Sequence, residues 1–127
     1  MSVADVQKLA DAFGDALASG DDSAAAALYE PDAGIWHNTD GVTQTLAENQ
    51  KLGAWLRRKM PDVAFTDARV TCAENAFVRR HRMTGTAPNG TPLSIESILF
   101  VEVSPAGKIA QMSEYLDSAA LAPLLTR

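Results

Sequence analysis

Residues 93–103 read LSIESILFVEV, and the alternation within this stretch decides the fold class. Ile95, Leu99 and Val101 fall on one side of an extended chain and Glu96 falls on the other, which is typical of a strand with one buried face. The same period of two marks residues 63–72, 76–86 and 108–116. The connections between these segments are short and carry turn residues, so the sequence predicts four strands with antiparallel neighbours.

The residues before this meander show the spacing of helices instead. Ser2 and Asp5 form a capping box, apolar side chains then recur every three or four positions, and Gly20 ends the first helix. We further expect a short helix over 21–29, a strand over 33–38, a helix that starts after Thr43 or Thr45 and reaches Lys59, and a last helical turn through Leu125, capped by Asp117 or Ser118. Helices followed by strands predict an α+β domain. A twisted sheet backed by so few helices is expected to leave a cavity.

Composition narrows the class of protein. The 127 residues are expected to form a single domain, 1–127, and 46% of them are hydrophobic, which is normal for a globular protein. A net charge of −5 argues against nucleic acid or an anionic membrane as a partner. Cys72 is the only cysteine, the two histidines are far apart, and there is no glycine-rich nucleotide motif, so we expect no disulfide, metal or other cofactor. The N-terminus does not look like a signal peptide, and a cytoplasmic location is the expectation.

Two segments resemble a known superfamily. Residues 28–38, LYEPDAGIWHN, resemble the junction between the second helix and the first strand in the nuclear transport factor 2-like superfamily, and residues 107–117, GKIAQMSEYLD, resemble its last hairpin and strand. The order of elements matches over nearly the whole chain, within the SnoaL-like branch that is related to ketosteroid isomerases and limonene epoxide hydrolases. The resemblance implies a cone-shaped roll, in which a bent, mostly antiparallel sheet wraps around about three N-terminal helices and one internal pocket, commonly in a homodimer.

The resemblance also nominates site residues. Counted from Asp32, His37 falls where ketosteroid isomerases carry their general-base aspartate, and Asn38 matches an asparagine of the epoxide hydrolases. Glu114 falls on a catalytic aspartate of the same hydrolases. Phe13 replaces the tyrosine that ketosteroid isomerases use as a donor, so steroid isomerisation is not implied. The hydrolases also need an Arg-x-Asp pair where this chain has residues 80–82, Arg-His-Arg, so epoxide hydrolysis is not implied either.

The chemistry of His37 and Glu114 fits a proton-transfer pair. An imidazole titrates near neutrality and suits a general base, although His37 could instead bond a loop carbonyl. Glu114 alternates with Met112 and Leu116 and should share their face. A lone carboxylate on a concave apolar face is expected to have a raised pKa, and it could act as an acid or hold His37. The alternative is a glutamate at the rim, paired with an arginine.

The residues expected to contact a ligand are Phe13, Trp36, Asn38, Trp55, His81 and Met112. The two tryptophans could form either pocket or core. His81 shares its parity with Phe77 and Met83, which favours the inner face and turns its neighbours outward, whereas counting against the epoxide hydrolases suggests the opposite facing. The outward side would carry the homodimer contact through Val78, Arg80, Ile98 and Phe100.

Three functions follow from these residues. The first is a cofactor-free isomerase, cyclase or dehydratase that moves protons on a small apolar molecule through His37 and Glu114. The second is a non-catalytic protein that binds such a ligand. The third is a dimeric interaction module whose cone is filled by Phe13, Trp36 and Trp55. Two titratable groups that face each other in the pocket would favour the first.

Overall fold

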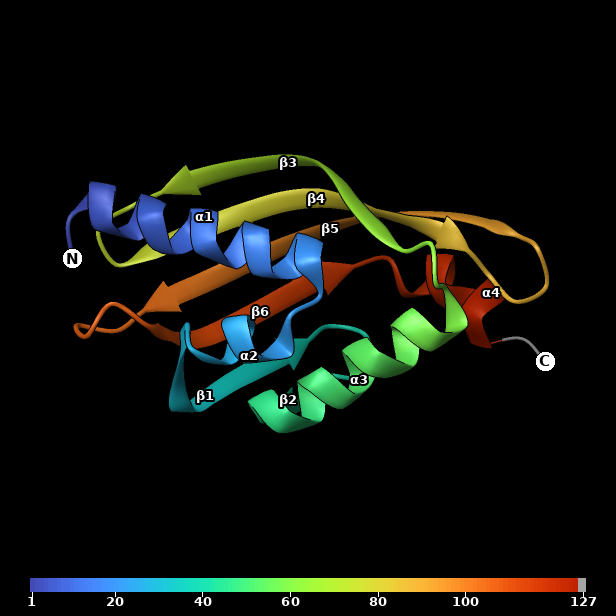
Figure 1. Cartoon of the computed structure of the whole chain (residues 1–127), viewed down its shortest axis with the longest axis horizontal. Helices are drawn as coiled ribbons and strands as arrows, with labels where there is room; N and C mark the ends of the chain where they lie inside the picture. Colours follow the sequence, from blue (N-terminus) through green and yellow to red (C-terminus); the bar gives the residue numbers. More distant parts are fainter. Residues whose placement is uncertain (126–127) are drawn as a thin grey trace.

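The computed structural model describes residues 1–125 as a bent six-stranded sheet with helices on one side (Figure 1). This arrangement confirms the α+β class and the cone-shaped roll. The elements in chain order are α1 (Val3–Ser19), α2 (Asp22–Ala26), β1 (Tyr29–His37), β2 (Thr43–Gln44), α3 (Leu46–Lys59), β3 (Ala64–Cys72), β4 (Ala76–Thr86), β5 (Pro92–Val103), β6 (Ile109–Leu116), the 3-10 helix η1 (Ser118–Leu121) and α4 (Ala122–Leu125).

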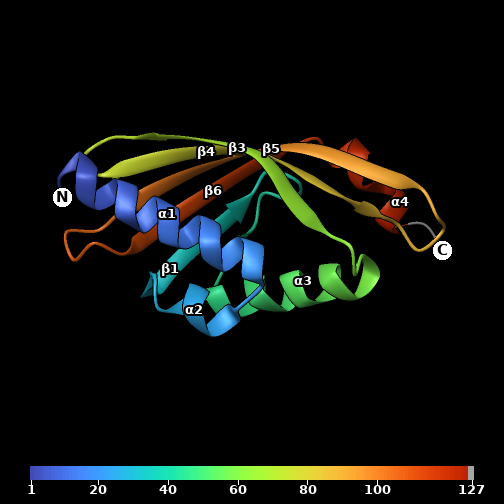
Figure 2. The same ribbon diagram turned by 45° about the horizontal axis from the view of Figure 1, so that its top comes forward.

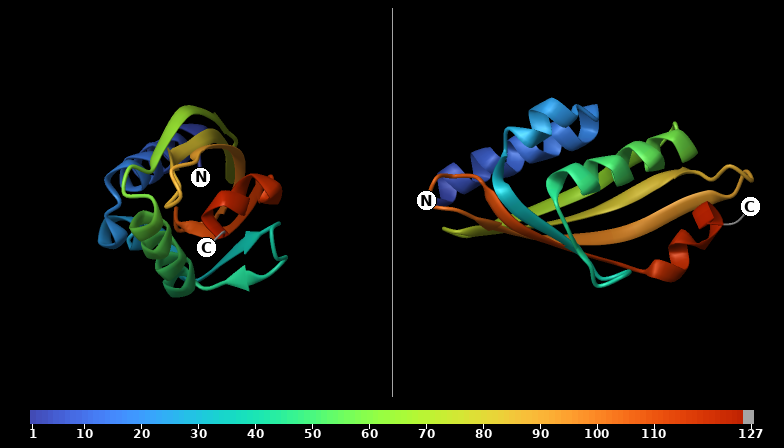
Figure 3. Two further views of the ribbon diagram at one scale, coloured as in Figure 1. Left: turned by 90° about the vertical axis from the view of Figure 1, so that its right-hand side faces the viewer. Right: turned by 90° about the horizontal axis from the view of Figure 1, so that it is seen from below.

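The strand order is β2-β1-β6-β5-β4-β3. The predicted meander from β3 to β6 is confirmed, and each pair within it is antiparallel. β1 joins the free edge of β6 in parallel, and the two-residue strand β2, which the sequence did not predict, covers the outer edge of β1. The sheet curves so that α1, α2 and α3 all lie on its concave side, while α4 closes the end near the C-terminus (Figures 2 and 3).

Local sequence accounts for the helix boundaries. Ser2 and Asp5 make the predicted capping box of α1, and Gly20 ends that helix in the left-handed conformation at φ 68°. Thr45 caps α3, and Thr43 belongs to β2 instead. Asp117 accepts a hydrogen bond from the backbone N–H of Ala119 and caps η1.

The junction between α2 and β1 differs from the prediction. The helix ends at Ala26 and not near Tyr29, and the strand begins at Tyr29 and not at Ala33. Pro31 lies within the strand. The pairing of β1 with β6 shifts its register between Tyr29 and Gly34, so the missing N–H of Pro31 removes no hydrogen bond from a regular ladder.

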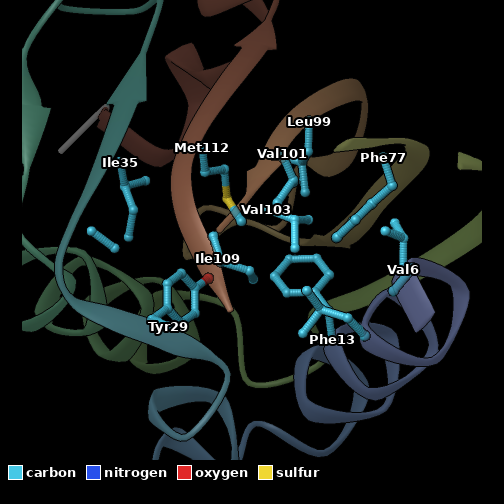
Figure 4. Packing of buried hydrophobic residues seen from close by; sticks show 13 residues of the cluster. Val6, Phe13, Tyr29, Ile35, Phe77, Leu99, Val101, Val103, Ile109 and Met112 are labelled. Carbon is cyan, nitrogen blue, oxygen red and sulfur yellow. The ribbon is translucent and has the colours of Figure 1, made fainter. Parts of the chain in front are cut away.

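Two apolar clusters fill the concave side. One lies under α1 and the other lies towards α4, where Met60, Met83, Ile95 and Leu124 pack together. Figure 4 shows the first cluster, in which Phe13 of α1 and Tyr29 of β1 meet side chains from β4, β5 and β6. Between the two clusters the inner face of the sheet is polar, and this interruption holds the candidate site.

Candidate active site

A row of polar side chains crosses the inner face of four neighbouring strands. We call it the polar belt, and its members are His37 of β1, Glu114 of β6, Ser97 of β5, and Arg79 and His81 of β4. In β5 every second residue is buried from Leu93 to Val103, and Ser97 is the one polar residue in that series. Register explains the alignment, because His37 pairs with Glu114 and Ser97 pairs with His81 across adjacent strands. The fold therefore places the belt on rigid backbone.

Glu114 is the centre of one half of the belt. Its Oε1 lies 3.2 Å from Nε2 of His37, and its Oε2 accepts a hydrogen bond from the hydroxyl of Ser97 at 2.9 Å. Both oxygens are thus held, while 21% of the glutamate side chain and 11% of the histidine side chain stay accessible. Two separate groups fix the carboxylate, so its orientation is set before any ligand arrives.

The charges in this half favour an ion pair. Burial by itself raises the pKa of the Glu114 carboxyl, but the hydrogen bond and charge of His37 and the hydroxyl of Ser97 hold that pKa below its usual value. The hydrogen bond to Glu114, helped by the charges of Glu114 and Asp40, outweighs burial and raises the pKa of His37. The expected raised pKa of Glu114 is therefore wrong, because the carboxylate is not isolated.

In the other half of the belt, a cationic side chain contacts an imidazole. Nε of Arg79 donates a hydrogen bond to Nδ1 of His81 at 2.9 Å, and both residues are buried, with 7% and 3% of their surface exposed. The His81 ring also packs against Phe65, with ring centroids 5.1 Å apart. Burial and the adjacent Arg79 charge outweigh the attraction of Glu114 and lower the pKa of His81 to about 4. His81 is therefore a neutral imidazole at physiological pH.

The belt borders a cavity of about 640 Å³. Its wall combines His37, Ser97, His81 and Glu114 with apolar side chains from the sheet, α1, α3 and the C-terminal turns, among them Phe13, Ile35, Trp55, Leu99, Met112 and Leu121. A second hollow of about 400 Å³ opens between α1, α2, α3 and β3, and it shares Phe13 and Tyr29 with the first but no member of the belt. The larger hollow thus combines room for a ligand with the titratable groups of the belt.

The sequence profile of the SnoaL-like domain matches residues 10–112. This range contains the whole of the belt strands β1, β4 and β5, and it ends within β6, before Glu114. The chain belongs to the SnoaL-like family. That family lies within the nuclear transport factor 2-like superfamily, so the resemblance seen in residues 28–38 and 107–117 is confirmed. No curated protein matches the chain significantly in sequence.

Solved structures of SnoaL-like and related proteins share this fold at low sequence identity. A nuclear transport factor 2-like protein of unknown function from Burkholderia pseudomallei superposes with a TM-score of 0.83 at 16% identity, and the match covers 100% of both chains. IdmH from Streptomyces antibioticus, a candidate polyketide cyclase, gives 0.80 at 19% identity over 95% of this chain and 99% of its own. AclR from Streptomyces galilaeus, a candidate hydroxylase, superposes with a TM-score of 0.80 at 19% identity, and the match covers 98% of this chain and 80% of AclR. At these identities the likeness concerns the fold.

Four of the six side chains expected around a ligand line the cavity of this SnoaL-like domain, namely Phe13, Trp55, His81 and Met112. The placement expected for Trp36 is wrong. It lies between two inward residues of β1, so the strand period turns it to the outer face, where its ring packs 5.2 Å from that of Tyr115. Asn38 does not line the cavity either. Its side-chain amide donates to the backbone C=O of Leu116 and accepts from the backbone N–H of the same residue, and these two hydrogen bonds connect the ends of β1 and β6.

Several residues of the site were not predicted. Ser97 and Arg79 share the parity of their apolar neighbours, and that signal was present in the sequence. Tyr29 is buried against the cavity, and burial together with the Glu114 charge raises the pKa of its hydroxyl. Gln44 of β2 also lines the cavity, and its Oε1 is buried without a hydrogen-bond partner among residues 1–125. These groups extend the polar surface available to a ligand.

Two further observations bear on the class of protein. Among residues 1–125, no cluster of three or more His, Cys, Asp or Glu side chains is arranged to hold a metal ion. Within the same range, no helix is both long enough and apolar enough to cross a membrane.

Proposed function

We propose that this protein is a cofactor-free enzyme that moves a proton next to the carbonyl group of a small, mostly apolar molecule. The observation that carries the proposal is the His37–Glu114 pair, with 3.2 Å between Nε2 and Oε1, on the wall of a cavity. A base fixed in place and open to a ligand is what proton abstraction from carbon requires. An apolar cavity without such a pair would have favoured a binding protein.

The roles within the pair follow from the charges. Glu114 is the carboxylate that accepts a hydrogen bond from Nε2 of His37. In the neutral ring, which prevails above the raised pKa of His37, Nδ1 is left to take a proton from the substrate. The same ring then returns the proton to another atom of the substrate. General acid–base help of this kind contributes roughly 10²- to 10⁴-fold in rate. Ser97 holds the second oxygen of Glu114 and so fixes the direction of the carboxylate.

The cavity indicates the kind of substrate. Its volume of about 640 Å³ lies within the range of roughly 300–1,000 Å³ that is typical of sites for drug-sized molecules. Most of the lining side chains are apolar, so one or two rings or a branched chain would be buried there. The unpaired Oε1 of Gln44 needs a donor, because an unsatisfied buried acceptor costs about 1–3 kcal/mol. A substrate hydroxyl would supply that donor.

Isomerisation, cyclisation and dehydration all use this chemistry. The structural likeness to IdmH, a candidate polyketide cyclase, supports cyclisation within this group, since polyketides carry carbonyls flanked by acidic C–H bonds. The geometry itself supports the step that the three reactions share, which is abstraction of a proton beside a carbonyl.

Deuterium exchange tests this step without knowledge of the substrate. Small cyclic and aromatic ketones are incubated with the protein in D₂O, and loss of the proton signal beside the carbonyl is followed by NMR. We expect exchange above the buffer rate in the wild type and in Glu102→Gln, an exposed glutamate on the outer face of β5, but not in His37→Phe. Probes that bind without exchange in the wild type would instead support the non-catalytic binding protein.

We also propose that the protein is a homodimer through the outer face of the sheet. Ile98 and Phe100 of β5 and Tyr115 of β6 are 44%, 42% and 48% exposed, and they are neighbours because Ile98 pairs with Tyr115. Large apolar side chains that gather on one face are typical of a surface covered by a partner. A second copy of the chain offers the same face and fits the two-fold arrangement that most homodimers use.

A further inference from the structure

Arg79 is a buried cation whose partner is not an anion. Its side chain points to the inner face of β4, and among residues 1–125 no carboxylate lies within ion-pair distance of it. Buried charges in proteins are usually paired with an opposite charge. Here Nε donates to Nδ1 of the neutral His81 ring at 2.9 Å. Such a costly arrangement calls for an explanation beyond stability.

The contact determines where His81 carries its proton. A guanidinium N–H can only donate, so Nδ1 of His81 must accept, and the neutral ring keeps its proton on Nε2. Protonation of both nitrogens would place two donors and two cations face to face. The charged groups near His81 are Arg79 on the same strand and Glu114 on β6, and the repulsion by Arg79 together with burial outweighs the attraction by Glu114.

The surroundings hold both side chains in place. The guanidinium carbon of Arg79 lies 6.0 Å from the centre of the Phe13 ring on α1. A Cβ at Gly14, the next residue of that helix, would stand 2.8 Å from Nη1 of Arg79, so glycine leaves the room that the guanidinium occupies. Phe65 of β3 packs against the His81 ring, with the two ring planes tilted by 56°. Nε2 of His81 has no hydrogen-bond partner within residues 1–125, and the residue lines the cavity.

We propose that Arg79 is a positioning residue that locks His81 as the neutral Nε2–H tautomer, so that His81 donates a hydrogen bond to the carbonyl oxygen of the bound substrate. The inference deepens the proposed function and rests on it for its chemistry. As His37 takes the proton, the electrons of the C–H bond form a carbon–carbon double bond and the carbonyl π pair moves onto oxygen. His81 then stabilises this oxygen, a role in which one fixed donor contributes roughly 10²- to 10³-fold in rate.

The spacing along the belt suits a substrate of one or two rings. Three interstrand steps of about 4.8 Å separate the backbones of β1 and β4, which gives roughly 14 Å between the ends of the belt. His37 contacts Glu114 at one end, and His81 is the cross-strand neighbour of Ser97 at the other. A flat ketone that lies on this part of the belt can therefore meet the base and the donor together.

The tautomer can be read directly by NMR of ¹⁵N-labelled histidine in the untagged protein. The chain has only two histidines, so the variant His37→Gln assigns both rings. We expect His81 in the wild type to show a protonated Nε2 and an unprotonated Nδ1, with no titration between pH 8 and about pH 5. Arg79→Met should give a mixture of tautomers and titration nearer pH 6.5, whereas Arg80→Met, an exposed neighbour, should leave the signals unchanged. A wild-type His81 with a protonated Nδ1, or one that titrates near pH 6.5, would overturn the proposal, and this outcome does not depend on whether Arg79→Met folds.

The donor role has its own test with 4-nitrophenolate, an aromatic oxyanion whose absorbance reports binding. We expect His81→Phe and Arg79→Met to weaken binding about tenfold or more, and Tyr29→Phe, which removes the rival donor on the wall, to change it less than twofold. The proposal fails if the wild type does not bind the probe, or if Tyr29→Phe loses binding while His81→Phe keeps it. If the tautomer and the binding results hold but no ketone exchanges deuterium, the proposed catalytic function falls and the assignment of Arg79 and His81 stands.

Discussion

Nε2 of His37 lies 3.2 Å from Oε1 of Glu114, and the two residues are register partners on neighbouring parallel strands. The pair thus depends on the one parallel contact in the sheet, between β1 and β6. The backbone that carries both side chains is paired in regular register from Gly34 to His37 and from Gln111 to Glu114. In the proposed mechanism, a general base held in this way keeps its orientation in the absence of substrate, which reduces the cost of reaching the transition state.

The first prediction concerns the coupling within this pair. Glu114→Gln removes the negative charge but keeps the size and a hydrogen-bonding group, so the pKa of His37 should fall from its raised value to about 6.5 or below. NMR titration of the His37 ring measures this shift. Glu102→Gln removes a glutamate from the exposed outer face and should leave the His37 titration unchanged. An equal His37 pKa in the wild type and in Glu114→Gln would show that the ion pair does not form in solution.

The second prediction concerns stability in acid. The pKa of His81 in the folded protein, about 4, lies below its ordinary value of 6.5, so the unfolded chain binds the proton more tightly. His81 therefore has no effect on the free energy of unfolding above pH 6.5, and it lowers that free energy as the pH falls towards 4. Relative to His81→Gln, which can still accept from Arg79, the wild type should lose about 3 kcal/mol of unfolding free energy between pH 7 and pH 4.

Denaturant unfolding at several pH values tests that difference, and His37 supplies a control of opposite sign. Its folded pKa is raised, so its contribution is present below pH 6.5 and is lost as the pH rises through the folded pKa. Relative to His37→Gln, the wild type should therefore lose stability on the alkaline side. Parallel curves for the wild type and His81→Gln would contradict a buried neutral His81.

Strand parity predicted part of the site and also explains what was missed. The alternation of Phe77 and Met83 correctly turned His81 inward, and it turns Arg79 inward as well. Parity and composition disagree at Arg79, because the strand period turns it inward while a charged side chain is normally exposed, and in the structure the period prevails. Trp36 shows the converse error, since its aromatic character suggested the pocket while the strand period placed it outside.

Other features were beyond the reach of the sequence alone. The strand β2 has only two residues, too few to show a period. The low pKa of Glu114 depends on His37, which is close only because β1 and β6 pair in parallel across the length of the chain. Local patterns predict faces, helices and turns, whereas protonation states depend on contacts between distant segments.

The third prediction compares two glycines within helices. Gly53→Ala in α3 should stabilise the protein by about 0.8–1.0 kcal/mol, because alanine favours the helix and the new Cβ meets Arg57 at an ordinary distance of 3.6 Å. Gly14→Ala in α1 should gain less or lose stability, because its Cβ would lie 2.8 Å from Nη1 of Arg79 and displace the guanidinium. Thermal unfolding of both variants measures the difference. An equal gain at both positions would mean that Arg79 does not occupy the space beside α1.

The last prediction concerns assembly. If the outer face of β5 and β6 is covered by a second copy, the wild type should sediment as a dimer at micromolar concentration, and Phe100→Lys should sediment as a monomer. The reason is that a lysine at the centre of an apolar contact leaves a buried charge without a partner, which costs several kcal/mol. Val42→Lys is the matched control, because Val42 is 51% exposed but lies in the turn before β2, away from that face.

The fold of each variant is checked by circular dichroism, so that loss of the dimer is not confused with unfolding. A monomeric wild type would remove the homodimer, and dissociation of both variants would move the interface away from the outer face. A stable contact of the usual size needs about 800 Å² from each copy, so the neighbouring exposed ring of Tyr115 should be covered as well. The fluorescence of Trp36, whose ring packs 5.2 Å from that of Tyr115, should therefore change on dilution below the dissociation constant.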